Sequence, residues 1–177
     1  MNDLVGLDEE SKDEVKKMPS RNHSLIVGRI TGLLFNDERF TIMPELSLDT
    51  SQIDLNQFNL KAKDELIPDI SIYQEAIDLS EPLDELKMIN MPALVIEVLS
   101  PRQGMNDIIA KFQAYFALGI KSCWLVIPAI KSITVYSQPN QHKTFDINDS
   151  EVIDEMMDIH LSTQKIFGKS HHYKLNY

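Results

Sequence analysis

The sequence predicts one α/β domain built on a mixed β-sheet, and three observations carry that prediction. Residues 93–99 are apolar on both parities apart from one carboxylate, as in a central strand that is covered on both faces. A helical pattern follows at 105–118, and a second apolar run follows at 123–127. A strand, a helix and another strand in close succession indicate a crossover between two parallel strands.

The first predicted helix covers residues 21–36. Ser20 has a side chain that commonly caps a helix, and apolar side chains recur at helical spacing after it. The predicted apolar face consists of Leu25, Ile26, Ile30, Leu33 and Leu34. His23 lies in the first turn, where a lone histidine is more often a simple polar residue at a helix end than a ligand.

Two further strands are expected before the central run. Residues 40–48 alternate between apolar and polar side chains, and Pro44 favours an edge position or a bulge there. Residues 68–73 form the second strand, with Asp69 next to its start. The polar stretches on either side of this second strand are expected to be loops, the later one acidic and solvated.

After residue 127 the patterns are weaker. Strands are expected at 132–137 and 143–147, an acidic helix near 150–158, and a short element at 160–167. No repeat or linker divides the chain.

Composition is that of a globular protein. The 177 residues are 43% hydrophobic and 25% charged, which suits one compact domain. We expect a polar leader at 1–19, the domain at 20–168 and a C-terminal tail at 169–177. The chain shows neither an apolar run that could cross a bilayer nor a secretion signal, so no membrane partner and a cytoplasmic location are expected.

The net charge and the cysteine content exclude or disfavour some classes of function. The formal net charge of -10 argues against a broad surface for nucleic acid, although a local cationic groove or a bound divalent metal can still bridge to phosphate. Cys123 is the single cysteine, which excludes an internal disulfide and a Cys-rich zinc site.

Glu97 is the one ionisable residue in the central run, where a carboxylate is costly unless it is paired. On the following helix, Asp107, Lys111 and Tyr115 recur at four-residue spacing, which places them on one side. Lys111 lies at the border of the apolar stripe, so its long stem can carry the ammonium to the end of the preceding strand. Glu97 and Lys111 are therefore expected to be neighbours.

Asp69 supplies a second carboxylate if the strands at 68–73 and 93–99 pair. Two carboxylates from adjacent strands suit Mg²⁺, which keeps several waters and also engages phosphate oxygens. A lysine beside the metal could orient or help deprotonate the attacking water, while the metal polarises the phosphoryl group. Such a set is suited to hydrolysing a phosphodiester.

The order Pro68-Asp69, then Glu97 in an apolar strand, then Lys111 resembles the PD-(D/E)XK nuclease superfamily with its restriction-endonuclease-like fold. More closely, MPALVIEVLSP followed by DIIAKFQAYFALGIKSCWLVIP resembles the Uma-two family of predicted restriction endonucleases, a domain of unknown function. The shared phrase is a strand ending E-V-L-S-P, a D-x-x-x-K-x-x-x-Y helix, a glycine turn and a tryptophan-bearing strand. It is most specific over residues 91–128.

This resemblance implies an endonuclease that hydrolyses DNA with Mg²⁺, or Mn²⁺, as cofactor. Asp69 and Glu97 would be the metal ligands and Lys111 the catalytic lysine, with Glu45 a weaker candidate for an additional ligand. Many nucleases of this fold act as dimers, so a homodimer is expected by analogy. Residues expected to support the site are Asp107, Tyr115 and His23, the last matching a histidine often seen in the family's first helix.

The chain departs from these patterns in two places. The superfamily's usual lysine would stand two residues after Glu97, where this chain has Leu99, so the catalytic role would pass to Lys111 on the helix. The family's common aspartate before the proline after the tryptophan strand is replaced by Ile127, away from the proposed centre.

Other interpretations stay open at this point. The chain could be a catalytically inactive nuclease-fold protein that acts as a non-enzymatic interaction module, which the acidic balance favours. Asp69 could be a turn-capping residue, and Glu97 with Lys111 a purely structural ion pair. Lys111 could equally pair with Asp107 on the helix surface.

Overall fold

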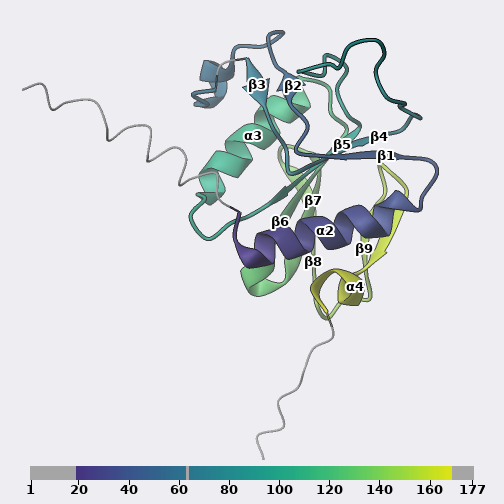
Figure 1. The fold of residues 1–177 in the computed structure, drawn as a ribbon. Coiled ribbons are helices and arrows are strands. Elements are labelled where there is room, and N and C mark those ends of the chain that lie inside the picture. The colour runs from purple at the N-terminus through teal and green to yellow at the C-terminus, as the bar shows by residue number, and fades with distance from the viewer. Residues whose placement is uncertain (1–18, 63, 169–177) are drawn as a thin grey trace, which may run out of the picture.

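The computed structural model describes residues 19–62 and 64–168, so the predicted tail and almost all of the predicted leader lie outside the described residues. Figure 1 shows a twisted sheet with helices on both of its faces. Within the described residues, none of the helices has the length and apolar character needed to cross a bilayer. In chain order the elements are α2 (Arg21–Phe35), β1 (Thr41–Pro44), β2 (Leu48–Asp49), η1 (Leu55–Phe58), β3 (Glu65–Leu66), β4 (Ile70–Tyr73), β5 (Leu94–Val98), α3 (Met105–Ala117), β6 (Ser122–Ile127), η2 (Pro128–Ile130), β7 (Ser132–Gln138), β8 (Gln141–Asp146), β9 (Glu151–Asp154), β10 (Ile159–Ser162) and α4 (Thr163–Phe167).

The predicted mixed α/β architecture is confirmed. Six strands form one sheet in the order β1-β4-β5-β6-β7-β8. β5 and β6 are parallel and are joined by α3, and every other neighbouring pair in this sheet is antiparallel. β4 pairs with β5 so that Ile70 is opposite Ile96, which meets the condition under which Asp69 and Glu97 can converge. The β5–α3–β6 crossover therefore lies at the centre of the sheet.

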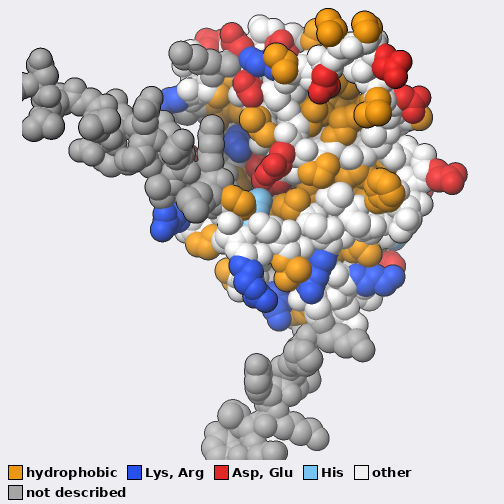
Figure 2. Space-filling view, in the orientation of Figure 1, with side chains coloured by type: hydrophobic (Ala, Val, Ile, Leu, Met, Phe, Trp, Pro, Cys, Tyr) orange, Lys and Arg blue, Asp and Glu red, His pale blue; other side chains and the backbone are white. Residues whose placement is uncertain are grey.

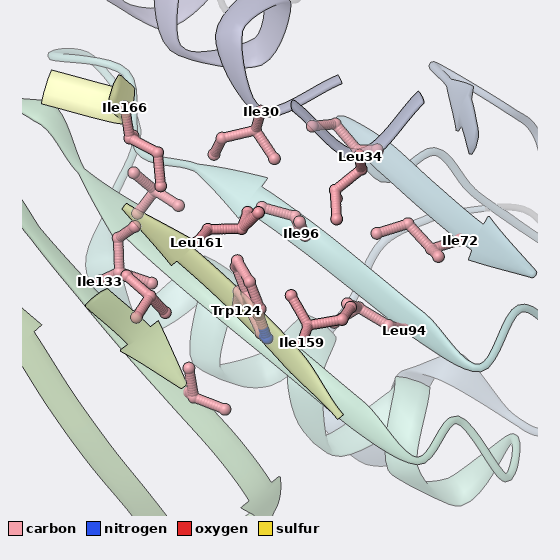
Figure 3. Packing of buried hydrophobic residues seen from close by; sticks show 14 of the residues in the cluster. Ile30, Leu34, Ile72, Leu94, Ile96, Trp124, Ile133, Ile159, Leu161 and Ile166 are labelled. Atoms are coloured by element: carbon pink, nitrogen blue, oxygen red, sulfur yellow. The ribbon is translucent and has the colours of Figure 1, made fainter. Parts of the chain in front are cut away.

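Side chains of the central strands alternate between two apolar clusters. Ile96 and Trp124 point to the face covered by α2 and the β9–β10 hairpin, in one cluster with Ile30 and Ile159 (Figure 3). Val95 and Leu125 point to the opposite face, where the buried side of α3 covers them. Glu97 has the same parity as Val95, because successive side chains on a strand point to opposite faces. The sheet geometry thus directs Glu97 towards α3.

The strand predicted at 40–48 is divided in two. β1 ends at Pro44, and the chain turns at Glu45, which has a φ of 53°. Pro44 has no N–H with which to continue the ladder, and β1 is an edge strand as that proline predicted. The connection after it is not a simple loop, because β2 pairs with β3 there and η1 lies between them.

The predicted apolar face of α2 needs one correction. Leu25 is 42% exposed, whereas the buried residues of the helix include His23. His23, Ile26 and Ile30 are three and four residues apart, which is the spacing of one helical face. Leu25 lies roughly 130° around the helix axis from the middle of that face, so it faces solvent. Ser20 caps the helix as expected, accepting a hydrogen bond from the His23 backbone N–H at 3.2 Å.

The acidic helix predicted near 150–158 is wrong. β9 and β10 form an antiparallel hairpin there, with Val152 opposite Leu161. The acidic composition does not place these residues on a solvated helix, because Asp154 is completely buried. Its Oδ2 accepts hydrogen bonds from Ser122 Oγ at 2.6 Å and Trp124 Nε1 at 2.7 Å, and its Oδ1 accepts one from the Met157 N–H.

Replacing Asp154 with alanine is expected to lower the free energy of unfolding by about 2–4 kcal/mol, because buried donors lose their acceptor. Urea denaturation would measure this, with Glu155→Ala as a matched control at the neighbouring exposed position. Equal stability of the two variants would contradict the structural role of Asp154.

Candidate active site

Asp69 is held at the start of β4 by two separate elements. Its Oδ1 lies 3.0 Å from Nε2 of His23 on α2, and its Oδ2 accepts the backbone N–H of Val98 on β5 at 2.6 Å. The His23 side chain is 11% exposed. The expectation that His23 is a simple polar residue at a helix end is therefore wrong, and the Asp69 carboxylate does more than cap its own turn.

Glu97 is bound by two side chains of α3. Lys111 Nζ lies 3.2 Å from Glu97 Oε1 and 3.4 Å from Oε2, and the Tyr115 hydroxyl donates to Oε1 at 2.7 Å. Glu97 is 2% exposed, while the Lys111 side chain is 22% exposed. The expected Glu97–Lys111 contact is present, and the ion pair of Lys111 is made with Glu97 rather than with Asp107.

Burial and charge perturb three of these groups. Burial raises the pKa of Glu97; the nearby charge of Asp69 adds to this, and Lys111 and Tyr115 oppose it without reversing it. Burial, together with the charge of Glu97, raises the pKa of Tyr115 well above its ordinary value, so its hydroxyl stays protonated and continues to donate. The hydrogen bond to Asp69 raises the pKa of His23 against the opposing effect of burial.

His23, Asp69, Glu97 and Lys111 line one groove of about 860 Å³, which we call the central groove. Figure 2 shows acidic side chains and a histidine gathered near the middle of the face that carries α2. The residues that line the central groove are Pro19, His23, Glu45, Lys61, Ala62, Glu65, Leu66, Ile67, Pro68, Asp69, Glu97, Ser100, Arg102, Gln103, Asp107 and Lys111. Asp69, Glu97 and Lys111 thus meet at one surface.

The remaining candidates lie around this centre. Glu45 lines the groove, and its backbone N–H donates to the carbonyl oxygen of Asp69 at 3.1 Å. Asp107 lies in the first turn of α3, where it is exposed, lines the groove and forms no ion pair with Lys111. Two cations of the groove, Lys61 and Arg102, were not predicted. Their sequence neighbourhoods show no periodicity, so only the folded chain brings them to the site.

Asp69 and Glu97 fit a hard divalent cation. Mg²⁺ is usually held by one or two carboxylates together with waters and substrate phosphates. Asp69 Oδ2 accepts the backbone N–H of Val98, the residue after Glu97, so the two carboxylates come from adjacent positions on paired strands. Over residues 19–62 and 64–168 no three His, Cys, Asp or Glu side chains form a metal-binding group. Two carboxylates beside a groove match the magnesium pattern rather than an enclosed protein cage.

The chain matches the model of a known protein family. A family model named Uma2 and described as "Putative restriction endonuclease" matches residues 9–163. The chain belongs to the Uma2 family. This confirms the resemblance carried by the E-V-L-S-P strand and the helix after it. The match covers both carboxylates, the lysine and the whole β5–α3–β6 unit.

A solved relative shares the fold of this Uma2 protein. It is a crystal structure described as "a putative nuclease belonging to DUF820" from Anabaena variabilis, with a TM-score of 0.64 and 23% sequence identity. The similarity covers 85% of this chain and 82% of that chain. At this identity the likeness shows the common nuclease-like architecture. No curated protein matches the sequence.

Proposed function

We propose that this Uma2-family protein is a metal-dependent nuclease that hydrolyses DNA phosphodiester bonds, with Mg²⁺ or Mn²⁺ as its cofactor. One observation carries the proposal. Asp69 from the start of β4, Glu97 from β5 and Lys111 from α3 converge on the central groove, with Lys111 Nζ 3.2 Å from Glu97. The family match supports a nuclease, and this geometry supports the residue roles.

Asp69 and Glu97 would hold the metal ion, with Glu45 a weaker candidate beside them. When bound, such an ion polarises a phosphoryl oxygen and lowers the pKa of a coordinated water. His23 and the Val98 N–H hold the Asp69 carboxylate in place, and Tyr115 does the same for Glu97. These contacts fix the two carboxylates before a substrate arrives, as catalytic preorganisation requires.

Lys111 would orient the attacking water and offset the charge that develops on the phosphoryl group. Its ammonium is anchored on Glu97 but remains partly exposed to the central groove. Leu99 occupies the usual superfamily position of this lysine, and it is partly buried among the apolar residues on the α3 side of the sheet. Lys111 lies one helical turn before Tyr115, and its ammonium reaches Glu97 from that position. This contact supports the assignment of the catalytic lysine to α3.

Replacing Asp69 with asparagine tests the metal site. We expect the wild type to bind Mg²⁺ in calorimetry and to cleave DNA with Mg²⁺ or Mn²⁺. Asp69→Asn is expected to weaken Mg²⁺ binding by about 10–100-fold and cleavage by about 10²–10³-fold, because one charged ligand is lost. Asp78→Asn, in the exposed acidic loop, removes the same charge away from the groove and should change neither quantity.

If the wild type neither binds Mg²⁺ nor cleaves DNA with either metal, the nuclease proposal fails. The non-enzymatic interaction module would then be the better interpretation. Metal binding that is equally strong in Asp69→Asn would instead reject this residue as a ligand.

A further inference from the structure

Two cations of the central groove have no role in the site described so far. Lys61 lies between η1 and β3, and Arg102 lies in the loop between β5 and α3. Both are exposed and both line the groove that contains Asp69 and Glu97. In the described part of the chain, no ion pair or side-chain hydrogen bond involves either of them. Among residues 19–62 and 64–168, therefore, neither positive charge has a protein partner.

The rest of the groove is not suited to a double helix. Glu97 at its floor is 2% exposed, and the Asp69 and Lys111 side chains are 20% and 22% exposed, so the reactive tips are recessed. A volume of about 860 Å³ is that of a site for one small ligand or a short piece of chain. The phosphates of a rigid duplex lie on the surface of a wide cylinder, with a major groove about 12 Å across. A duplex therefore cannot insert a single phosphate into a recessed site while its other phosphates stay outside.

Electrostatics also favours a single strand over a duplex. A duplex presents one negative charge per about 1.7 Å of axis, whereas one strand presents one per about 3.4 Å. The walls of the groove carry Glu45, Glu65 and Asp107 as well as the two cations, and the whole chain has a formal charge of -10. A second strand would lie against acidic protein. Two free cations can neutralise the phosphates on either side of a reacting one.

We infer that the central groove takes single-stranded DNA, as an unpaired end or a flap, with Lys61 and Arg102 each contacting a phosphate next to the one at Asp69 and Glu97. This inference rests on the proposed nuclease function for the reacting phosphate, and it assigns the form of the substrate. The described residues of the groove include no Phe, Tyr or Trp side chain on which bases could stack. Binding should therefore depend on backbone charge and tolerate different base sequences.

Fluorescence anisotropy with the full chain in EDTA tests this inference. The probes are a labelled single strand of about 12 nucleotides and a hairpin duplex of the same sequence. The single strand should bind at least about ten-fold more tightly than the duplex. Each phosphate contact on a single strand contributes about 0.7 to the slope of log affinity against log salt, so two contacts give a slope near -1.4.

Lys61→Ala and Arg102→Ala should each reduce that slope by about 0.7. Each should also weaken binding by about eight-fold at 50 mM salt, which is the factor that an exponent of 0.7 gives. Lys121→Ala is the matched control, because Lys121 is an exposed cation that lines a different pocket beside Gln74. The control should bind as the wild type does.

Equal or tighter binding of the duplex, or an unchanged salt slope in both variants, would overturn the inference. The proposed function is separate from this result, because no cleavage occurs in EDTA. If the protein binds single strands in this way but never cuts them with Mg²⁺ or Mn²⁺, single-strand binding is supported and the nuclease function is rejected. A protein that cuts duplex DNA equally well without Lys61 or Arg102 would give the reverse result.

Discussion

Replacing Glu97 with glutamine is expected to abolish DNA cleavage and at the same time to stabilise the protein. Cleavage should fall by at least about 10³-fold, because a charged group at the reacting centre is removed. The free energy of unfolding should rise by about 0.5–2 kcal/mol, which is the common range for a single stabilising substitution. Burial raises the pKa of Glu97, so the fold disfavours its charged form, and neutral glutamine avoids that cost.

Urea denaturation and a cleavage assay on the same Glu97→Gln preparation check both parts. The amide oxygen can still accept the hydrogen bond from Tyr115, and Lys111 is exposed enough to turn towards water. A structural ion pair predicts the opposite result, a loss of about 3–5 kcal/mol as seen when a buried pair is broken. Loss of stability together with full activity would reject the assignment of Glu97.

Replacing Lys111 with methionine is expected to lower cleavage by about 10²–10⁴-fold, the range for removing a group that assists water attack. The apolar stem is kept, so the packing of α3 against the sheet should persist. Lys121→Met at an exposed position away from the groove should leave cleavage unchanged. Cleavage at the wild-type rate by Lys111→Met would reject Lys111 as the catalytic lysine in place of the superfamily position that Leu99 occupies.

The same variant should show a steeper dependence of stability on pH. Lys111 is the strongest influence that lowers the pKa of Glu97, so without it that pKa rises further. Between the ordinary glutamate pKa of about 4.3 and the raised value, the folded state holds a proton that the unfolded chain releases. The free energy of unfolding therefore falls as pH rises through this window. Denaturation at pH 5 and pH 8 should show a larger fall for Lys111→Met than for the wild type.

The sequence by itself determined the centre of this protein. The apolar run of β5, the amphipathic pattern of α3 and the apolar run of β6 are local signals, and a short link leaves them one way to pack. The Glu97–Lys111 contact could be predicted from the sequence because both residues lie within this β5–α3–β6 unit. The buried carboxylate needed a partner, and the helix offered one lysine at the right border.

Only the tertiary structure decided the contacts that cross between distant segments. His23 reaches Asp69 because α2 packs over the sheet, and Asp154 is buried because the β9–β10 hairpin folds onto Trp124. Lys61 and Arg102 meet at the central groove from loops that have no periodic pattern. Periodicity reports which side of an element is buried, but it does not report which other element covers that side. The Glu97–Lys111 pair therefore follows from local sequence, whereas the residues that hold and surround this pair depend on tertiary packing.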